Sequence, residues 1–261
     1  MMNSRPIPLF LGFFLALACC AQSSQDQHLQ EVQQQYDQLK GQLDQLSGTL
    51  EHAKLDVIDH DLAQWGYPAL GPNDVVVVHP GHALVWDDVH HVPKWTAHII
   101  TPDIDQGNLA RIDTFLPDPL VKGNTALVTS YWYSGYDRGH MVPSADMRWS
   151  LDALKATYLY SNISPQKPEL NRGAWADLED WMRRYVHYSG HRVYVVTAPI
   201  LGPDMPLLNK PKSPDDVSIP PYFFKAMGDI DGPVKKGIAF VMSNGLNDHG
   251  LLSYSVSIDS V

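Results

Sequence analysis

Beyond about residue 62, the apolar residues of this chain fall into short runs of four to eight residues, bounded by proline, glycine or aspartate. Runs of this length that are rich in β-branched and aromatic residues predict strands. The predicted strands are residues 75–78, 83–86, 95–100, 126–133, 193–197 and 238–242. Helical patterns interrupt them, so the chain is expected to form an α+β domain with a mixed β-sheet core over residues 62–261.

Two helices are predicted within this domain. The first runs from residue 150 or 151 to residue 160, and the second begins near Asn171, a residue type that often caps helices, and ends at Gly190. The expected core-facing stripe of the second helix is Ala174, Leu178, Trp181, Tyr185 and Tyr188. Glu179 is about 100° around the helix from Leu178, so it can reach a site beside the buried face.

The first residues predict a targeting segment. Residues 9–18 form an apolar run of ten residues after Arg5, too short to span a bilayer and typical of a signal peptide over residues 1–21. Cleavage after Ala18 or Ala21 fits the small residues there. The protein is therefore expected to be exported, to the periplasm, the outer membrane or the extracellular space.

The chain has two cysteines, Cys19 and Cys20, directly after the apolar run. Two interpretations remain open: they are inert residues of a removed signal peptide, or one of them carries a lipid anchor. The stretch Leu17-Ala18-Cys19-Cys20 resembles a bacterial lipobox imperfectly. The mature domain has no cysteine, so no disulfide framework holds it together.

Residues 22–58 form a Gln-rich segment with a heptad pattern. Apolar residues recur in steps of three and four at Leu29, Val32, Tyr36, Leu39, Leu43, Leu46, Leu50, Ala53 and Val57. Gly41 and Gly48 each weaken such a helix by about 1 kcal/mol relative to alanine. Three interpretations remain open: a coiled coil that joins copies of the chain through residues 29–57, a helix folded back on the globular domain, and a loosely helical spacer.

The strongest chemical signal is the stretch Asp137-Arg138-Gly139-His140-Met141-Val142-Pro143-Ser144, followed later by Asn171 and Glu179. A histidine base, a neutral oxygen ligand, a carboxylate and arginines suit metal-assisted cleavage of a phosphodiester. The net charge of −10 is unfavourable for a protein that packages nucleic acid, since backbone binding depends on Lys and Arg. It is compatible with an enzyme that holds a few nucleotides.

Three ordered motifs resemble the DNA/RNA non-specific endonuclease family, whose members share a ββα-metal finger active site. The motifs are Asp137 to His140, then Ser161-Asn162-Ile163-Ser164-Pro165-Gln166, then Leu170-Asn171 through Leu178-Glu179. Residues 111–118, 222–225 and 254–257 also fit the family. The resemblance covers residues 62–261. The family usually continues past the last match, so a terminal packing element is expected to be missing after Val261.

The resemblance implies a role for each matching residue. His140 would be the general base, Asn171 the direct ligand of Mg²⁺, for which Mn²⁺ is a substitute, and Glu179 a holder of metal-bound water. Arg111 would face the phosphoryl group as negative charge builds. Arg138 and Arg183 would support the phosphate or the carboxylates, and Asn162 would orient residues near His140.

Several of these residues also have purely structural interpretations. Asn171 is suited to capping a helix, and Glu179 to pairing with Arg183. Arg138 is equally suited to a salt bridge with Asp137, which is expected to shape the finger. The histidines at 79, 82, 90 and 91 lie near Asp87 and Asp88 but lack zinc-ligand spacing, so a surface loop is expected there.

The sequence therefore predicts an exported, Mg²⁺-dependent endonuclease that acts on DNA and RNA with little sequence preference. Family members leave a 5′-phosphate and a 3′-hydroxyl. Two alternatives remain: a non-catalytic surface or coiled-coil adaptor that carries a decayed nuclease domain, and a narrower phosphodiesterase that acts on small nucleotides or on one nucleic acid.

Overall fold

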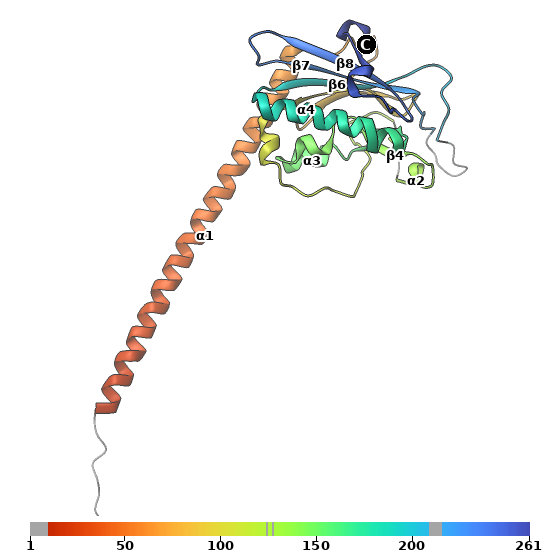
Figure 1. Cartoon of the computed structure of the whole chain (residues 1–261). Coiled ribbons are helices and arrows are strands. Elements are labelled where there is room, and N and C mark those ends of the chain that lie inside the picture. Colours follow the sequence, from red (N-terminus) through yellow and green to blue (C-terminus); the bar gives the residue numbers. More distant parts are fainter. Residues whose placement is uncertain (1–9, 124, 127, 209–215) are drawn as a thin grey trace, which may run out of the picture. The chain divides into compact units, whose positions relative to one another are not determined.

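The computed structural model describes residues 10–123, 125–126, 128–208 and 216–261 (Figure 1). The chain divides into two units, Met1–Ala53 and Lys54–Val261. Helix α1 (Phe10–Trp65) begins in the first unit and ends in the second. Residues 1–9 of the expected signal peptide, and the side chains of Cys19 and Cys20, lie outside what is described. No helix in the described part is long and apolar enough to cross a membrane.

The helix predicted for residues 22–58 is confirmed, since α1 runs through this segment and through both of its glycines without a break. The heptad residues of the first unit are exposed to solvent. Leu29, Leu39 and Leu46 are 65%, 64% and 66% exposed, and Tyr36, Leu43 and Leu50 are similar. The apolar heptad residues of the first unit therefore form an exposed stripe along α1.

The second unit is built on a seven-stranded antiparallel sheet in the order β1-β2-β3-β6-β7-β8-β9. Its strands are β1 (Val76–His79), β2 (His82–Asp87), β3 (Val92–Ile100), β6 (Val193–Ile200), β7 (Tyr222–Asp229), β8 (Lys236–Ser243) and β9 (Ser255–Val256). Five of these strands match the predicted runs. β7 was not predicted as a strand, although its alternating burial is that of a strand with one face turned inward.

Helix α4 (Trp175–Ser189) packs on one face of this sheet, as Figure 1 shows. Its buried residues Leu178 and Met182 share a cluster with Phe223 of β7 and Phe240 of β8. The last turns of α1 supply Ile58 and Leu62 to a different cluster, which contains side chains of β2 and β3. Helix α4 and the last turns of α1 therefore cover opposite faces of the sheet, so the sheet is the central layer of the domain.

The buried stripe of α4 differs in part from the prediction. Its buried residues are Trp175, Leu178, Met182 and Val186, whereas Tyr188 is 81% exposed. The helix ends at Gly190 as predicted, because Gly190 adopts φ 69°, a left-handed conformation that glycine accepts without strain.

Two other predictions are wrong. Within residues 126–133, predicted as a strand, the structure has the single-turn helix α2 (Val128–Tyr131). His79 and His82 do not lie in a surface loop: they are 5% and 0% exposed on β1 and β2. His79 is bonded there to the buried carboxylate of Asp118 at 2.8 Å.

A separate two-stranded sheet supports the motif around His140. Strand β4 (Asp137–His140) pairs antiparallel with β5 (Ile163–Gln166), so that His140 lies opposite Ile163. Between them lie helix α3 (Leu151–Ala156), shorter than predicted, and the 3₁₀ turns η2 (Ser144–Met147) and η3 (Tyr160–Asn162). The π-helical segment η4 (Leu170–Ala174) follows β5 and leads into α4. The order is strand, strand, helix.

The remaining short elements are 3₁₀ turns. They are η1 (Pro102–Gln106), η5 (Leu251–Tyr254) and η6 (Ile258–Ser260). The turn η1 joins the end of β3 to the segment that carries Arg111, and η5 and η6 flank β9 at the edge of the sheet.

Candidate active site

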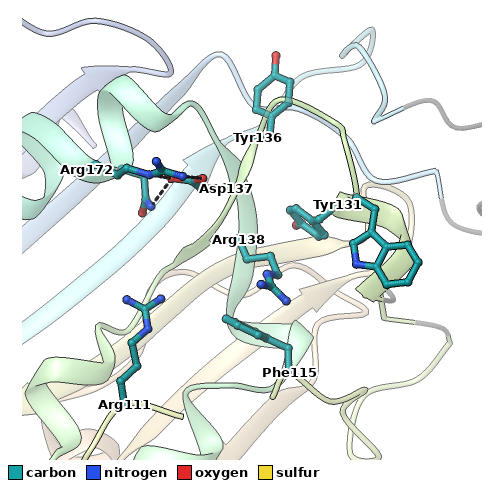
Figure 2. Close-up of a pocket in the computed structure, with 9 residues that line it drawn as sticks. Arg111, Phe115, Tyr131, Tyr136, Asp137, Arg138 and Arg172 are labelled. Atoms are coloured by element: carbon teal, nitrogen blue, oxygen red, sulfur yellow. Dashed lines mark hydrogen bonds and ion pairs between the residues drawn. The ribbon is translucent and has the colours of Figure 1, made fainter. Parts of the chain in front are cut away.

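A cavity of about 490 Å³ opens beside β4 and the π segment (Figure 2). The side chains that line it are Arg111, Phe115, Tyr131, Trp132, Tyr136, Asp137, Arg138, Asn171 and Arg172. Three of the sequence-predicted site residues, Arg111, Arg138 and Asn171, are thus brought together from three separate segments of the chain.

Asp137 connects two residues of the π segment to β4. Its carboxylate accepts a hydrogen bond of 2.9 Å from Nδ2 of Asn171 and two bonds, of 2.7 and 2.6 Å, from the guanidinium of Arg172. Burial favours the neutral form of Asp137, but the bonds from Arg172 and Asn171 outweigh it and lower the pKa of this carboxyl. The carboxylate of Asp137 therefore links β4 to the π segment through Asn171 and Arg172, and it is not paired with Arg138.

The side chain of Asn171 is oriented by this bond. Because Nδ2 donates to Asp137, the amide oxygen Oδ1 is on the other branch of the side chain, and it has no hydrogen bond within the described residues. Asn171 does not cap the helix, contrary to one interpretation: neither η4 nor α4 has a side-chain cap. Its amide oxygen is left available to a ligand.

The π segment explains how Asn171 reaches the cavity. Gly173 within it has φ −112° and ψ −120°, which interrupts the helical path just before α4 begins. Widened or interrupted turns of this kind are frequent at functional sites because they redirect a side chain.

Arg111 and Arg138 are the cations that face the cavity without an acidic partner. Among the residues that the structure describes, neither forms an ion pair, whereas Arg172 is paired with Asp137. The guanidinium of Arg138 lies over the ring of Phe115, 4.2 Å from its centroid, which holds the planar group in place. Two guanidiniums without carboxylate partners can bind an anion such as phosphate.

His140 lies at the end of β4, packed between two aromatic rings. Its ring centroid is 5.5 Å from that of Phe115 and 4.9 Å from that of Tyr158. Burial, together with the positive charges of Arg111 and Arg138, lowers the pKa of His140 to about 3. The imidazole is therefore neutral at pH 7 and can accept a proton.

Glu179 lies away from the cavity lining, in a buried group of charges. Its Oε1 is 3.7 Å from Nζ of Lys225, a fully buried lysine of β7. That ammonium donates to Thr197 Oγ1 at 2.8 Å and to the carbonyl of Met141, the residue after His140, at 3.1 Å. Burial raises the pKa of Glu179, and the charge of Lys225 opposes this shift.

Arg183 pairs with other acids and not with Glu179. Its guanidinium lies 2.9 Å from Asp146 and 4.0 Å from Asp180, and it does not line the cavity. Asp146 in turn is bonded to the buried His98 at 3.0 Å. The guanidinium of Arg183 is thus engaged by Asp146 and Asp180, and its role in the reaction stays a prediction.

Asn162 is fully buried and uses its amide on backbone groups. Its Oδ1 accepts from the backbone N–H of Val142 at 2.9 Å, and its Nδ2 donates to the carbonyls of Val142 and Thr157. It holds the chain two residues beyond His140, so its contribution to the site passes through the backbone.

Sequence reasoning missed two contributors. Arg172 directly follows Asn171 in the sequence, and this proximity to the predicted ligand was the available signal. Lys225 lies in the quoted stretch 222–225, whose alternation places it on the inward face of β7. Lysine is rarely buried unless its ammonium is paired with acceptors, so a lysine at an inward position was the available signal of a buried polar site.

The donors fit a hydrated divalent cation. Asn171 offers an unbonded amide oxygen at the cavity, whereas Glu179, whose buried Oε1 has no hydrogen-bond partner, lies outside the cavity lining and would act only through water. Within the described residues no group of three or more His, Cys, Asp and Glu side chains could hold a metal. Few protein ligands and several waters are the coordination that Mg²⁺ accepts, because it dehydrates reluctantly.

Comparison with solved structures gives the class of protein. The solved EndoG/EndoGI complex matches this chain with a TM-score of 0.67 and 26% identity, covering 77% of this chain and 86% of the other. The fold is that of the ββα-metal nucleases, with the finger formed by β4, β5 and α4.

The family follows from the sequence comparisons. The model of the DNA/RNA non-specific endonuclease family matches residues 60–261, and the chain belongs to this family of metal-dependent nucleases. It is 31% identical over 204 residues to a nuclease of Nostoc sp., covering 74% of this chain and 72% of that protein.

Mitochondrial proteins are also similar. Nuclease 1 of Schizosaccharomyces pombe is 35% identical over 176 residues, and human endonuclease G is 30% identical over 175 residues. These matches cover 63% and 64% of this chain, and just over half of each relative, 53% and 58%.

Proposed function

We propose that the protein is an exported, Mg²⁺-dependent endonuclease that hydrolyses phosphodiester bonds of DNA and RNA with little sequence preference. The observation that carries this proposal is the meeting of Asn171, with its free amide oxygen, and the unpaired Arg111 and Arg138 in one cavity. This cavity offers a metal ion an oxygen ligand, and it offers a phosphate two guanidiniums.

His140 acts as the general base in this proposal. Its lowered pKa keeps the ring neutral but also weakens it as a base, and an anionic phosphate bound at Arg111 and Arg138 would offset their charges and restore basicity for proton transfer from the attacking water. Asn162 is a positioning residue, since it bonds the backbone just after β4 and so keeps His140 in place.

Asn171 would hold the metal directly, and Glu179 would hold it through water. When bound, Mg²⁺ or Mn²⁺ supplies Lewis acidity to the phosphate oxygens. The chain's own contribution is orientation and charge: Asp137 fixes the amide of Asn171, and the Lys225 ammonium stabilises the carboxylate of Glu179 electrostatically from 3.7 Å. Because these contacts hold the side chains before the metal binds, Asn171 and Glu179 need to move less when it does.

Arg111 and Arg138 bind the phosphate in this proposal. Arg111 faces the group on which negative charge increases during attack, and Arg138 is held by Phe115. Arg183 would not contact the phosphate directly, because its guanidinium is paired with Asp146. Contacts to phosphate carry no base information, which accounts for low sequence preference. The products are a 5′-phosphate and a 3′-hydroxyl.

Removal of the metal tests this function. The purified protein is expected to degrade both plasmid DNA and RNA in Mg²⁺, to stop when EDTA is added, and to recover when Mg²⁺ or Mn²⁺ is restored. Gel electrophoresis of both substrates provides the measurement. Cleavage that persists in EDTA would contradict the metal requirement. Absence of cleavage with either metal would favour the non-catalytic adaptor, and hydrolysis of small phosphodiesters alone would favour the narrower enzyme.

The sequence of residues 1–21 supports export. The proposal includes a lipid anchor at Cys19 or Cys20. Mass spectrometry of the protein isolated from its native cells tests both: a mature chain that begins at Cys19 or Cys20 and carries acyl mass supports the anchor. A chain that begins after Ala21 without added mass contradicts the anchor and supports soluble secretion.

The heptad residues of α1 fit a second copy of this chain. Positions that flank the apolar seam are mostly uncharged, among them Gln33, Gln35 and Gln42. Asp37, Asp44 and Glu51 recur every seven residues on a different side of the helix. Two copies can therefore bring their seams together without placing like charges opposite each other.

Deletion of residues 22–53 is expected to convert an oligomer into a monomer, because the seam would be lost. Light scattering coupled to gel filtration measures the mass of each particle. Nuclease activity should persist, since every proposed catalytic residue lies at or beyond Arg111. A matched variant that replaces the exposed Asp37 and Asp44 with asparagine should stay oligomeric. A monomeric full-length protein would rule out pairing.

A further inference from the structure

The cavity has two chemically different sides. Figure 2 shows Arg111 and Arg172 on the left of the view and Phe115 and Tyr131 to their right, with the guanidinium of Arg138 beside the ring of Phe115. Four of the nine lining residues are aromatic: Phe115, Tyr131, Trp132 and Tyr136. Phosphodiester hydrolysis does not require aromatic groups, so the proposed reaction leaves this side unexplained.

Trp132 is the aromatic residue of this side that is most open to solvent. Its side chain is 57% exposed, whereas Tyr131 and Phe115 are 6% and 9% exposed. The ring of Phe115 is covered by Arg138, and that of Tyr136 has Nζ of Lys167 4.1 Å from its centroid. Within the described residues, no ring or cation contact covers the indole of Trp132.

The turn that carries Trp132 is fixed by its own hydrogen bonds. Ser134 is central to it: its backbone N–H and its hydroxyl both donate to the carbonyl of Tyr131, at 3.2 and 2.9 Å. The same hydroxyl accepts from the backbone N–H of Tyr136 at 3.1 Å, just before β4. Gly135 permits the tight path with φ 78°.

The buried neighbour of Trp132 anchors this turn to the core. The ring of Tyr131 stacks on Tyr160, with centroids 6.1 Å apart and an interplanar angle of 20°. Tyr160 lies in η3, directly before β5. The backbone that carries the exposed indole is therefore anchored to the finger that carries His140 before substrate binds.

We propose that Trp132 is a stacking platform for a nucleobase, and that the favoured substrates are single-stranded DNA or RNA. A nucleotide with its phosphate at Arg111 and Arg138 has its base directed to the aromatic side of the same cavity. In a single strand a base is free to leave its neighbours and stack on a side chain, whereas in a duplex it is already stacked and paired. This inference rests on the proposed nuclease function and adds its substrate class.

Two single strands of equal length test whether Trp132 stacks on a base. The first is oligo-dT, and the second has the same sugar–phosphate backbone but no bases. The wild-type full-length protein in Mg²⁺ is expected to have a kcat/KM about 5- to 150-fold higher for oligo-dT, the effect of one base stacked on an aromatic ring. In Trp132→Ala this ratio should fall towards one, because kcat/KM for oligo-dT decreases while kcat/KM for the abasic strand is unchanged. Trp132→Phe should keep most of the ratio, because a ring remains.

Trp65→Ala is the matched control, since Trp65 is also exposed, at 47%, and does not line the cavity. Its ratio should equal that of the wild type. An undiminished ratio in Trp132→Ala, or an equal loss of activity on both strands, would overturn the platform. A wild-type protein that cleaves neither strand nor plasmid would instead overturn the proposed function, so the two failures are distinguishable.

Discussion

Replacing His140 with alanine is expected to lower kcat about 10²- to 10⁴-fold, the usual contribution of a positioned general base. The buried Nε2 of His140 has no hydrogen-bond partner, so the substitution removes a base without leaving a buried protein group unpaired at that atom. Steady-state cleavage of a fluorescent oligonucleotide at saturating Mg²⁺ measures the loss.

Two controls distinguish lost catalysis from lost structure. Thermal unfolding should show that His140→Ala remains folded, with a modest loss of stability from the space left beside Phe115 and Tyr158. His249→Ala removes a histidine whose side chain is 73% exposed and should keep wild-type kcat. A folded His140→Ala protein with near-normal turnover would contradict the proposed mechanism.

Replacing Asn171 with alanine is expected to raise the Mg²⁺ concentration for half-maximal activity by more than about 10-fold, the lower end of what losing an outer-shell partner causes. Activity should recover in part at high Mg²⁺, because His140 and the arginines remain. A metal titration of the initial cleavage rate provides the measurement.

The control for this variant is Asn108→Ala, an exposed asparagine outside the cavity, whose metal titration should match the wild type. Binding of Mn²⁺, followed by electron paramagnetic resonance, should weaken in Asn171→Ala even without substrate. An unchanged Mn²⁺ affinity, with activity lost at every Mg²⁺ concentration, would show that Asn171 is needed for something other than metal binding.

Local patterns predicted much of this fold. The central strands β2, β3, β6 and β8 follow from runs of buried β-forming residues, and α4 from its helical period and Gly190. The finger strands β4 and β5 gave no such signal, because Asp137-Arg138-Gly139-His140 has no apolar alternation. Only the resemblance indicated a finger there.

The error over residues 126–133 has a physical cause. Its β-forming residues favour a strand, but Ser134 closes a turn on Tyr131, and Gly135 takes a positive φ. Side-chain hydrogen bonds within a turn compete with strand formation, and here they prevail. The exposed position of Trp132 depends on that turn and so was not predictable from composition.

The identities of the site residues were more predictable than their partners. Arg138 and Arg172 are both close enough in the fold to be candidates for Asp137, and the sequence offers no reason to prefer Arg172. In the structure Arg172 pairs with Asp137, whereas Arg138 lies over the ring of Phe115. The position of Glu179 beside Lys225 likewise depends on how α4 packs on β7, a contact between segments more than forty residues apart.

The distribution of cations in the cavity has a consequence for how ionic strength affects the enzyme. Each phosphate that a protein neutralises releases condensed counterions, so the logarithm of affinity falls with the logarithm of salt concentration in proportion to the number of such contacts. Arg172 is already neutralised by Asp137, which leaves Arg111 and Arg138 to release counterions here. With a net charge of −10 for the whole chain, little non-specific attraction adds to them. Cleavage should therefore tolerate salt better than that of a nuclease that grips a long stretch of backbone.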